Sequence, residues 1–302
     1  MLDYLINNKE WLFSGVGVFV LSAVGSVLFI RNSKEKKTDT HSAPTLKTEH
    51  KVIIKPVELT EVEKLAQRFR RVLELMNEGR NYSKFTIPQL ARIMKLHSIS
   101  ELEGVFIGKK EPSFQFITDF SIAFGVNEKW LVEGVGTPYS SSISSKSDPL
   151  DYLEDIESLK PESIYFIREN TETSCAFILL RLTKWKYVIL DRTWHISDHV
   201  GHGGQRQLLS FYKLIKKLRD EKRMHTSCWG LTLEKALFDA LLCGEKFPGQ
   251  FTDTGFSEDP WWDDLTDINH KYPIAESYEK WYGKSFIKAQ EIIKWKLSEV
   301  GS

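Results

Sequence analysis

The sequence carries no net charge, because its 302 residues include 41 Lys and Arg and 41 Asp and Glu. A protein without excess positive charge has no bulk attraction for nucleic acid, so binding to DNA requires a local basic patch. Cysteine is scarce as well. Cys175, Cys228 and Cys243 are widely spaced and form neither a CxxC metal pair nor a disulfide framework. Their small number fits a reducing compartment such as the cytosol.

Common catalytic signatures are also absent. The sequence has no phosphate-binding P-loop, no Ser-His-Asp order, no paired-carboxylate motif and no internal repeat. It therefore does not indicate a P-loop nucleotide hydrolase, a triad hydrolase or a repeat protein. No cofactor is indicated either, apart from the divalent metal considered below.

One long stretch lacks charge altogether. The residues from Trp11 to Ile30 carry no charged side chain, and as a helix they would span about 30 Å, the thickness of a bilayer's hydrocarbon core. A cleaved signal peptide would have a basic head and a small-residue cleavage site. Here the head contains Asp3 and Glu10, and the stretch ends at Ile30-Arg31. We therefore expect a signal-anchor, with a transmembrane helix over 11–30.

The charges on either side of this stretch predict its orientation. The C-terminal side is basic, whereas the tail over 1–10 offers only Lys9, so the positive-inside rule places residue 31 onward in the cytoplasm. The basic residues are Arg31, Lys34, Lys36 and Lys37. The segment NKEWLFSGVGV resembles anchors that tether soluble domains in many bacterial membrane proteins. This implies a single-pass protein of the bacterial inner (cytoplasmic) membrane, with its N-terminus outside and the lipid bilayer as a partner.

The remaining chain divides by composition into a multidomain arrangement. Residues 31–56 are polar and without periodicity, which is typical of a flexible linker. Residues 57–139 have helical periodicity, and a Ser-rich linker follows over 140–150. Residues 151–302 mix strand and helix patterns. The expected fold is therefore one transmembrane helix, an all-α five-helix domain and an α+β C-terminal domain.

The helices of the first domain have clear start and stop signals. Thr86 and Pro88 are placed to begin a helix, and Gly79 and Gly125 to end one. The sequence predicts helices over Glu61–Gly79, from Thr86 through Met94, up to Phe106, over Phe114–Phe124, and around Trp130-Leu131.

Four motifs in this region carry a family resemblance. They are Ile87 to Met94; Ser98, Ser100 and Leu102; the Gly-Lys-Lys-Glu-Pro-Ser turn from Gly108; and the closing run from Phe124 to Pro138. Together they resemble a lambda-repressor-like (Cro-type) helix-turn-helix domain. The resemblance implies that the second helix of the motif lies in the major groove, with its first residues at the base edges.

Mapped onto this sequence, the resemblance implies a set of DNA contacts. The positions at the base edges are Ser98, Ser100 and Glu101. The candidate phosphate contacts are Arg92, Lys95, Lys109 and Lys110. The common base-reading side chains are absent from the expected recognition helix before Gly108, and residues 57–139 hold 11 basic and 11 acidic residues. We therefore expect DNA binding of weak or unknown specificity. A domain reused for protein assembly or homo-oligomerisation is the alternative.

The C-terminal domain reads as α+β. Alternating and β-branched segments predict strands over Ser163–Arg168, Ala176–Leu182 and Trp185–Leu190, the last two joined as a hairpin. Helical periodicity predicts helices over Leu208–Leu218, Leu231–Cys243 and Tyr278–Val300, the last with a weak point at Gly283.

A loop in this domain gathers metal-binding residue types: His195, Asp198, His199 and His202. Imidazole and carboxylate can hold Zn or another divalent metal, although the spacing lacks the glutamate of the HExxH motif. The alternatives are a ligand-binding loop and a structural loop with hydrogen-bonded histidines. Gly203 and Gly204 precede the helix expected at Leu208, whose N-terminus can receive an anion beside Arg206.

Two further features have a functional and a structural interpretation. The basic face from Lys213 to Arg223 can contact nucleic acid or anionic lipid, or it is a solvated helix face. The loop Glu258–Asp264 joins carboxylates to Trp261 and Trp262, so it can grip a cationic or planar ligand, or simply anchor itself on the surface.

The main hypothesis from the sequence is a membrane-tethered helix-turn-helix transcription regulator. Its middle domain would bind DNA, and its C-terminal domain would sense a ligand or partner. The first alternative is a bacterial defence or signalling protein that uses the helix-turn-helix domain for protein assembly. The second is a metal-dependent enzyme using the cluster from His195 to His202; an enzyme is the less favoured class.

Overall fold

The computed structural model describes residues 59–302, except 142, 221–226, 254–257, 271–274 and 301–302. The expected tail over 1–10, transmembrane helix over 11–30 and linker over 31–56 lie outside these residues. Within the described part, no helix is both long and apolar enough to cross a membrane. All described residues belong to one compact unit, Glu58–Ser302.

A helical segment comes first in the chain. Its helices are α4 (Glu61–Asn77), α5 (Ile87–Ile93), α6 (Ile99–Phe106), α7 (Phe114–Phe124) and α8 (Glu128–Glu133). Capping boxes begin α4 at Thr60 and α5 at Thr86. In each, the threonine side chain accepts from the backbone N–H of the third helical residue, and the side chain of that residue accepts from the threonine N–H. Gly125 ends α7 at φ 65°, in the left-handed region. The expected helices of this region are confirmed.

The helical segment is held together by an aromatic core. Phe69 of α4 packs against Phe106 of α6 and Phe120 of α7, with ring centroids 5.8 and 4.7 Å apart. All three rings are buried, and each full burial of such a ring stabilises by about 2–3 kcal/mol. Because α4 also packs on α8, it is the central helix of the segment.

An α+β region with a four-stranded mixed sheet follows. The sheet has the order β3-β2-β1-β4; β1 pairs antiparallel with β2, β2 antiparallel with β3, and β1 parallel with β4. The strands are β1 (Ser163–Glu169), β2 (Cys175–Thr183), β3 (Lys186–His195) and β4 (Ser227–Leu233). The helices are η1 (Pro149–Tyr152), α9 (Leu153–Leu159), α10 (His202–Asp220), α11 (Lys235–Leu242), α12 (Gly249–Thr252), α13 (Trp261–Asp264), α14 (Ala275–Tyr282) and α15 (Lys284–Val300).

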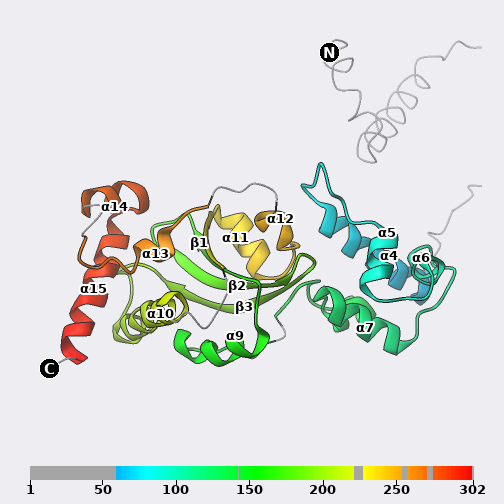
Figure 1. Cartoon of the computed structure of the whole chain (residues 1–302), viewed down its shortest axis with the longest axis horizontal. Helices are drawn as coiled ribbons and strands as arrows, with labels where there is room; N and C mark the ends of the chain where they lie inside the picture. The colour runs from blue at the N-terminus through cyan, green and yellow to red at the C-terminus, as the bar shows by residue number, and fades with distance from the viewer. Residues whose placement is uncertain (1–58, 142, 221–226, 254–257, 271–274, 301–302) are drawn as a thin grey trace, which may run out of the picture. The chain divides into compact units, whose positions relative to one another are not determined.

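The sheet separates two hydrophobic cores because successive side chains of a strand point to opposite faces. Ile164 and Phe166 of β1 lie in the core covered by α9, α10, α13 and α15. Tyr165 and Ile167 lie in the core that contains α11, α12 and the helical segment. Figure 1 shows α11 and α12 on one side of the sheet and α9 and α10 on the other.

The helical segment is joined to the α+β region by polar contacts as well as by this shared core. The guanidinium of Arg80 lies 2.8 Å from the carboxylate of Asp253, and both side chains are largely buried. The backbone N–H of Tyr139 donates to the carbonyl of Gly244 at 2.9 Å. Tyr139 itself packs on Phe247, with centroids 5.5 Å apart. These contacts fix the position of the helices on the sheet.

Several sequence predictions in the α+β region were wrong in their limits. The helix predicted over Leu231–Cys243 is the strand β4 followed by α11, because the parallel partner β1 lies far away in the sequence. The helix predicted over Tyr278–Val300 is broken into α14 and α15 at Gly283, at φ 88°, which confirms the weak point expected there. The three strands expected from alternation are confirmed.

Candidate nucleic-acid interface

The α5–turn–α6 unit is built by local signals in the chain. After α5, Lys95 adopts a left-handed conformation at φ 57°, and the N–H of Leu96 donates to the carbonyl of Ala91. This reverses the chain and lets α6 pack across α5. Leu90 of α5 and Leu102 of α6 are fully buried and hold the two helices together. The opposite face of α6 is left for other contacts.

The start of α6 presents hydroxyl groups. Ser98, Ile99 and Ser100 are exposed, and the hydroxyls of Ser98 and Ser100 lie 2.9 Å apart. Ser98 also donates to the carboxylate of Glu101 at 3.4 Å. This bond places the Glu101 carboxylate beside the hydroxyls at the helix start, where it accepts from Ser98.

The basic side chains around α6 are available for a partner. Each is exposed, and none forms a side-chain hydrogen bond or an ion pair with another residue that the structure describes; they are Arg92, Lys95, Lys109 and Lys110. By contrast, Lys64 pairs with Glu61 at 2.8 Å. A cation without an internal partner keeps its full charge for an anionic ligand.

Backbone hydrogen bonds fix two of these cations at the end of α6. The N–H groups of Lys109 and Lys110 both donate to the carbonyl of Gly104, at 2.9 and 3.0 Å. Arg92 and Lys95 flank the turn before the helix. The unpaired cations therefore lie at both ends of α6.

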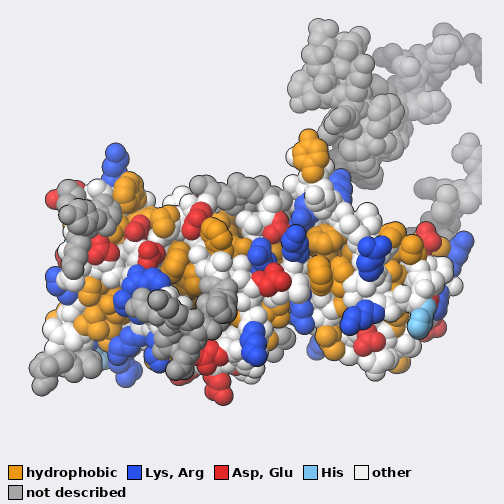
Figure 2. All heavy atoms as spheres, in the orientation of Figure 1, with side chains coloured by type: hydrophobic (Ala, Val, Ile, Leu, Met, Phe, Trp, Pro, Cys, Tyr) orange, Lys and Arg blue, Asp and Glu red, His pale blue; other side chains and the backbone are white. Residues whose placement is uncertain are grey.

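Within residues 59–302, apart from the gaps named above, the α+β region does not cover α6. This helix packs on α4 and α5, whereas α7 is the helix of the segment that meets β3. In Figure 1, α6 lies at the end of the helical segment away from the sheet. On the face drawn in Figure 2, basic side chains are scattered over the molecule among acidic and hydrophobic ones, and they do not form one continuous patch. This arrangement suits a few separate phosphate contacts.

The expected metal cluster does not assemble. His195 ends β3 and His202 begins α10, so the two side chains belong to different elements. The part of the chain described by the structure, which includes all four residues, contains no group of three His, Cys, Asp or Glu placed to hold a metal. Asp198 instead accepts from Lys288 at 2.9 Å, with His199 4.0 Å away. The hydrogen bond from Lys288 lowers the pKa of the Asp198 carboxyl.

His195 has a different partner. Its Nδ1 lies 3.4 Å from the sulfur of Cys175 across the β2–β3 pair. Burial, reinforced by the charge of Glu169, raises the pKa of the Cys175 thiol to about 11. The thiol therefore stays protonated at neutral pH, which does not suit an activated nucleophile.

The expected anion site at the start of the helix is also changed. Helix α10 begins at His202, earlier than predicted, so Gly203 and Gly204 lie inside its first turn. A Cβ at Gly204 would lie 2.7 Å from the Cβ of Val200, which shows that this glycine allows close packing. Arg206 is exposed on the next turn.

The two tryptophans of the loop Glu258–Asp264 pack into the hydrophobic core. Trp261 is fully buried and donates from its indole to the carbonyl of Phe166 at 3.2 Å. Trp262 is stacked on the Phe166 ring, with centroids 5.2 Å apart. The interpretation of this loop as a grip for an exposed ligand was therefore wrong. On the basic face of α10, Arg219 donates to Asp263 at 2.6 Å.

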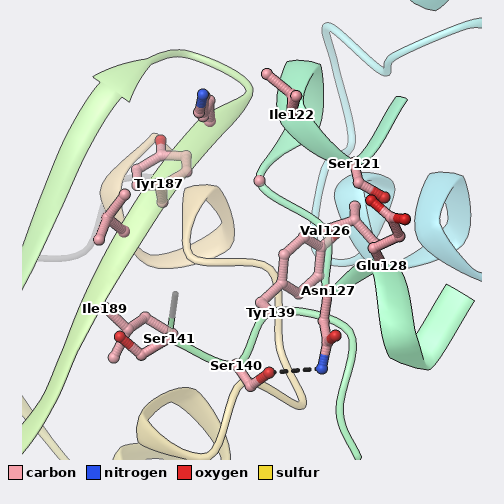
Figure 3. Close-up of a pocket in the computed structure, with 13 residues that line it drawn as sticks. Ser121, Ile122, Val126, Asn127, Glu128, Tyr139, Ser140, Ser141, Tyr187 and Ile189 are labelled. Atoms are coloured by element: carbon pink, nitrogen blue, oxygen red, sulfur yellow. Dashed lines mark hydrogen bonds between the residues drawn. The ribbon is translucent and has the colours of Figure 1, made fainter. Parts of the chain in front are cut away.

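Sequence reasoning missed a cavity between the helical segment and the sheet. It has a volume of about 370 Å³ and lies among the end of α7, the residues around Tyr139 and the start of β3 (Figure 3). The side-chain amide of Asn127 donates to the hydroxyl of Ser140 at 2.7 Å along its wall. Ser121 and Tyr139 also line it, and their buried hydroxyls have no hydrogen-bond partner in the described part. Burial raises the pKa of Tyr139.

No single stretch of sequence contains this cavity, because its walls come together only through tertiary packing. Comparison with known proteins gives no match to a family model, to a curated protein or to a solved structure. The function must therefore be argued from the residues themselves.

Proposed function

We propose that this protein is a membrane-tethered transcription regulator whose residues 57–139 form a lambda-repressor-like helix-turn-helix domain. Helix α6 enters the major groove of DNA, and the α+β region over 151–302 senses a ligand or partner. The observation that carries the proposal is the start of α6, which is exposed among the described residues, together with cations at both ends of the helix that have no ion pair there.

The expected affinity comes mainly from phosphate contacts. The four unpaired cations around α6 can each neutralise one phosphate, which gives a slope of log K against log salt of about −3 to −4. Ser98 and Ser100 can donate to base edges but do not select one base strongly. The regulator therefore binds duplex DNA with modest sequence preference and strong salt dependence.

The membrane anchor belongs to the same proposal. Residues 11–30 are apolar and a basic run follows them, so the anchor places the DNA-binding face on the cytoplasmic side of a bacterial inner membrane. The linker over 31–56 has a coil reach of about 25–30 Å. The regulator thus acts on DNA that comes close to the inner leaflet.

A titration of full-length protein in nanodiscs with fluorescent duplex DNA tests the proposal. Wild-type protein is expected to bind at 50 mM salt, and Lys109→Glu/Lys110→Glu to weaken binding at least tenfold and lower the salt slope by about 2. Lys294→Glu, an exposed cation of α15 on the other side of the sheet, is the matched control and should stay within about twofold. If wild-type protein shows no anisotropy change even at this low salt, the DNA-binding proposal is wrong.

A second function has one observation in its favour. Large apolar side chains are exposed near α6: Ile99 is 49%, Ile107 53% and Phe114 79% exposed. Large apolar side chains that are exposed on one helical segment are candidates for a contact with another protein. The alternative is therefore assembly through the helix-turn-helix segment. Analytical ultracentrifugation of wild type and Phe114→Ser distinguishes the two, because only assembly predicts self-association or partner binding that the substitution abolishes.

A further inference from the structure

A groove lies between α5 and the turn that joins β2 to β3. Its volume is about 400 Å³, which is within the range of small-molecule sites. The groove brings together the first helix of the helix-turn-helix unit and a hairpin that is distant in sequence. It is lined by Phe85, Gln89, Arg92, Ile93, Lys184 and Trp185.

The walls of this groove are held in place by neighbouring groups. The backbone of Phe85 exchanges two hydrogen bonds with the side chain of Asn77, at 2.7 and 2.9 Å. The Phe85 ring packs edge-to-face with Phe247, and the guanidinium of Arg80 lies 4.9 Å from the centroid of the Phe85 ring. On the other wall, Trp185 packs against the shared core. A site fixed in this way loses little entropy when a ligand binds.

The polar side chains that line the groove offer hydrogen-bond donors to a ligand and no free acceptor among the described residues. Arg92 and Lys184 are exposed and have no ion pair in the described part, and none of the six lining residues is acidic. The oxygen of the Gln89 amide accepts from the N–H of Thr86 at 2.9 Å, which leaves its NH₂ group for a ligand. Apolar walls with a donor-only rim are complementary to a molecule that has an apolar body and one anionic group.

We propose that this groove binds a small amphipathic anion, with a flat apolar body between Phe85 and Trp185 and a carboxylate, sulfonate or phosphate at Arg92 and Lys184. The inference deepens the proposed function and its regulatory part rests on it. Arg92 cannot hold the ligand and a DNA phosphate at once, so the bound anion lowers the affinity for DNA. The ligand therefore acts as an inducer that releases the regulator.

The binding test uses a matched pair of probes with the full-length protein in nanodiscs. The anionic probe is 6-fluoro-2-naphthoate and the neutral one is its amide, both followed by ¹⁹F line broadening against empty nanodiscs. The anion is expected to bind about tenfold tighter than the amide. Arg92→Gln/Lys184→Gln should remove that difference while the amide affinity stays within about twofold, and Lys294→Gln should change neither.

Three results overturn the site. The first is equal binding of the anion and the amide by wild-type protein. The second is anion binding that the double variant leaves unchanged. The third is that naphthoate does not saturate the protein, while the double variant binds DNA more weakly and its salt slope falls by about 2; the groove then belongs to nucleic acid.

A second titration separates this inference from the proposed function. Saturating naphthoate is expected to weaken duplex binding by wild-type protein severalfold and to have no effect on the double variant. Naphthoate binding by a protein that never binds DNA supports the site and rejects the regulator. DNA binding that saturating naphthoate leaves unchanged keeps the regulator and rejects the competition at Arg92.

Discussion

Arg80 shows how much a single buried charge contributes to the joint between the two regions. Its guanidinium pairs with Asp253 at 2.8 Å and its Nε donates to the carbonyl of Met76 at 2.9 Å. Arg80→Ala leaves Asp253 without its main partner, so we expect a loss of about 3 kcal/mol in the free energy of unfolding, measured by urea titration of residues 58–302. The loss is at the low end for such pairs, since Arg181 lies 3.6 Å from the same carboxylate.

The matched control is another arginine of the same segment. Arg71 pairs with Glu74 at 3.4 Å on the surface. Arg71→Ala should cost less than about 0.5 kcal/mol, because water screens an exposed pair. Equal losses in the two variants would show that the Arg80 contact does not hold the regions together.

Glu169 gives a prediction about acid stability. Its side chain is 3% exposed and accepts from the hydroxyls of Thr171 and Thr173, at 2.7 and 2.9 Å. Burial raises the pKa of Glu169, but these hydrogen bonds, with those from Cys175 and Lys235, outweigh it and lower the pKa to about 2. Because this carboxyl has a lower pKa in the folded than in the unfolded protein, its ionisation stabilises the fold at pH values above the unfolded pKa. That stabilisation is lost as the pH falls toward 2.

The measurement is the free energy of unfolding at pH 6 and at pH 2.5. Between these values wild-type protein should lose about 2–3 kcal/mol more than Glu169→Gln, which has no proton to gain at this position. Parallel pH profiles for the two proteins would contradict the assignment.

At the residue level, the sequence predicted those features that depend only on close neighbours. The exposure of Arg92, Lys95, Lys109 and Lys110 agrees with their expected role as contacts to a partner, because Arg92 lies on the polar face of a helix and the three lysines lie in turns. The metal-site interpretation of the histidine cluster was wrong because its geometry depends on where β3 ends and α10 begins. The groove at Trp185 and the cavity at Tyr139 could not be predicted from the sequence, because each forms only when segments far apart in the chain come into contact.

Two glycines at helix ends offer a test of element packing. Gly244 follows α11 at φ 75°, and Gly283 separates α14 from α15 at φ 88°. A Cβ at Gly244 would lie 2.4 Å from the backbone carbon of Tyr139, whereas one at Gly283 meets nothing within 4 Å. Gly283→Ala should therefore lower the free energy of unfolding only by the strain of the left-handed backbone, about 1 kcal/mol. Gly244→Ala should lower it by at least about 3 kcal/mol.

Thermal unfolding of residues 58–302 with each substitution measures the difference. Because both positions have similar backbone conformations, the excess at Gly244 reports the contact between α11 and the segment at Tyr139. A loss at Gly283 as large as that at Gly244 would mean that conformation alone sets the cost.

At the level of elements, local signals were sufficient wherever a cap or a stop defined the boundary. The capping residue Thr86 and the stop at Gly125 place α5 and α7 as the sequence predicts. Strand β4 was missed because it contains Gly230, which weakens a strand pattern. Asp259 explains this glycine: its carbonyl would lie 2.0 Å from a Cβ at position 230.

For the whole molecule, the shared core predicts cooperative unfolding. Phe124 and Leu131 of the helical segment belong to the same buried cluster as Phe177 and Leu179 of the sheet. Since neither region can lose its partner without exposing this core, we expect residues 58–302 to melt in one calorimetric transition, with a ratio of calorimetric to van't Hoff enthalpy of about 1. Two separate transitions would show that the regions fold independently.

The parallel pairing of β1 with β4 also sets the order in which the chain can fold. Arg168 and Thr232, which face each other in this pair, are 64 residues apart. Helices α4 to α8 precede the sheet in the chain, so they can begin to form while the ribosome is still making the sheet. The inner edge of β1 stays open until β4 has been synthesised. During that interval the nascent chain exposes an unpaired strand, and this is the stage at which a chaperone would protect it from aggregation.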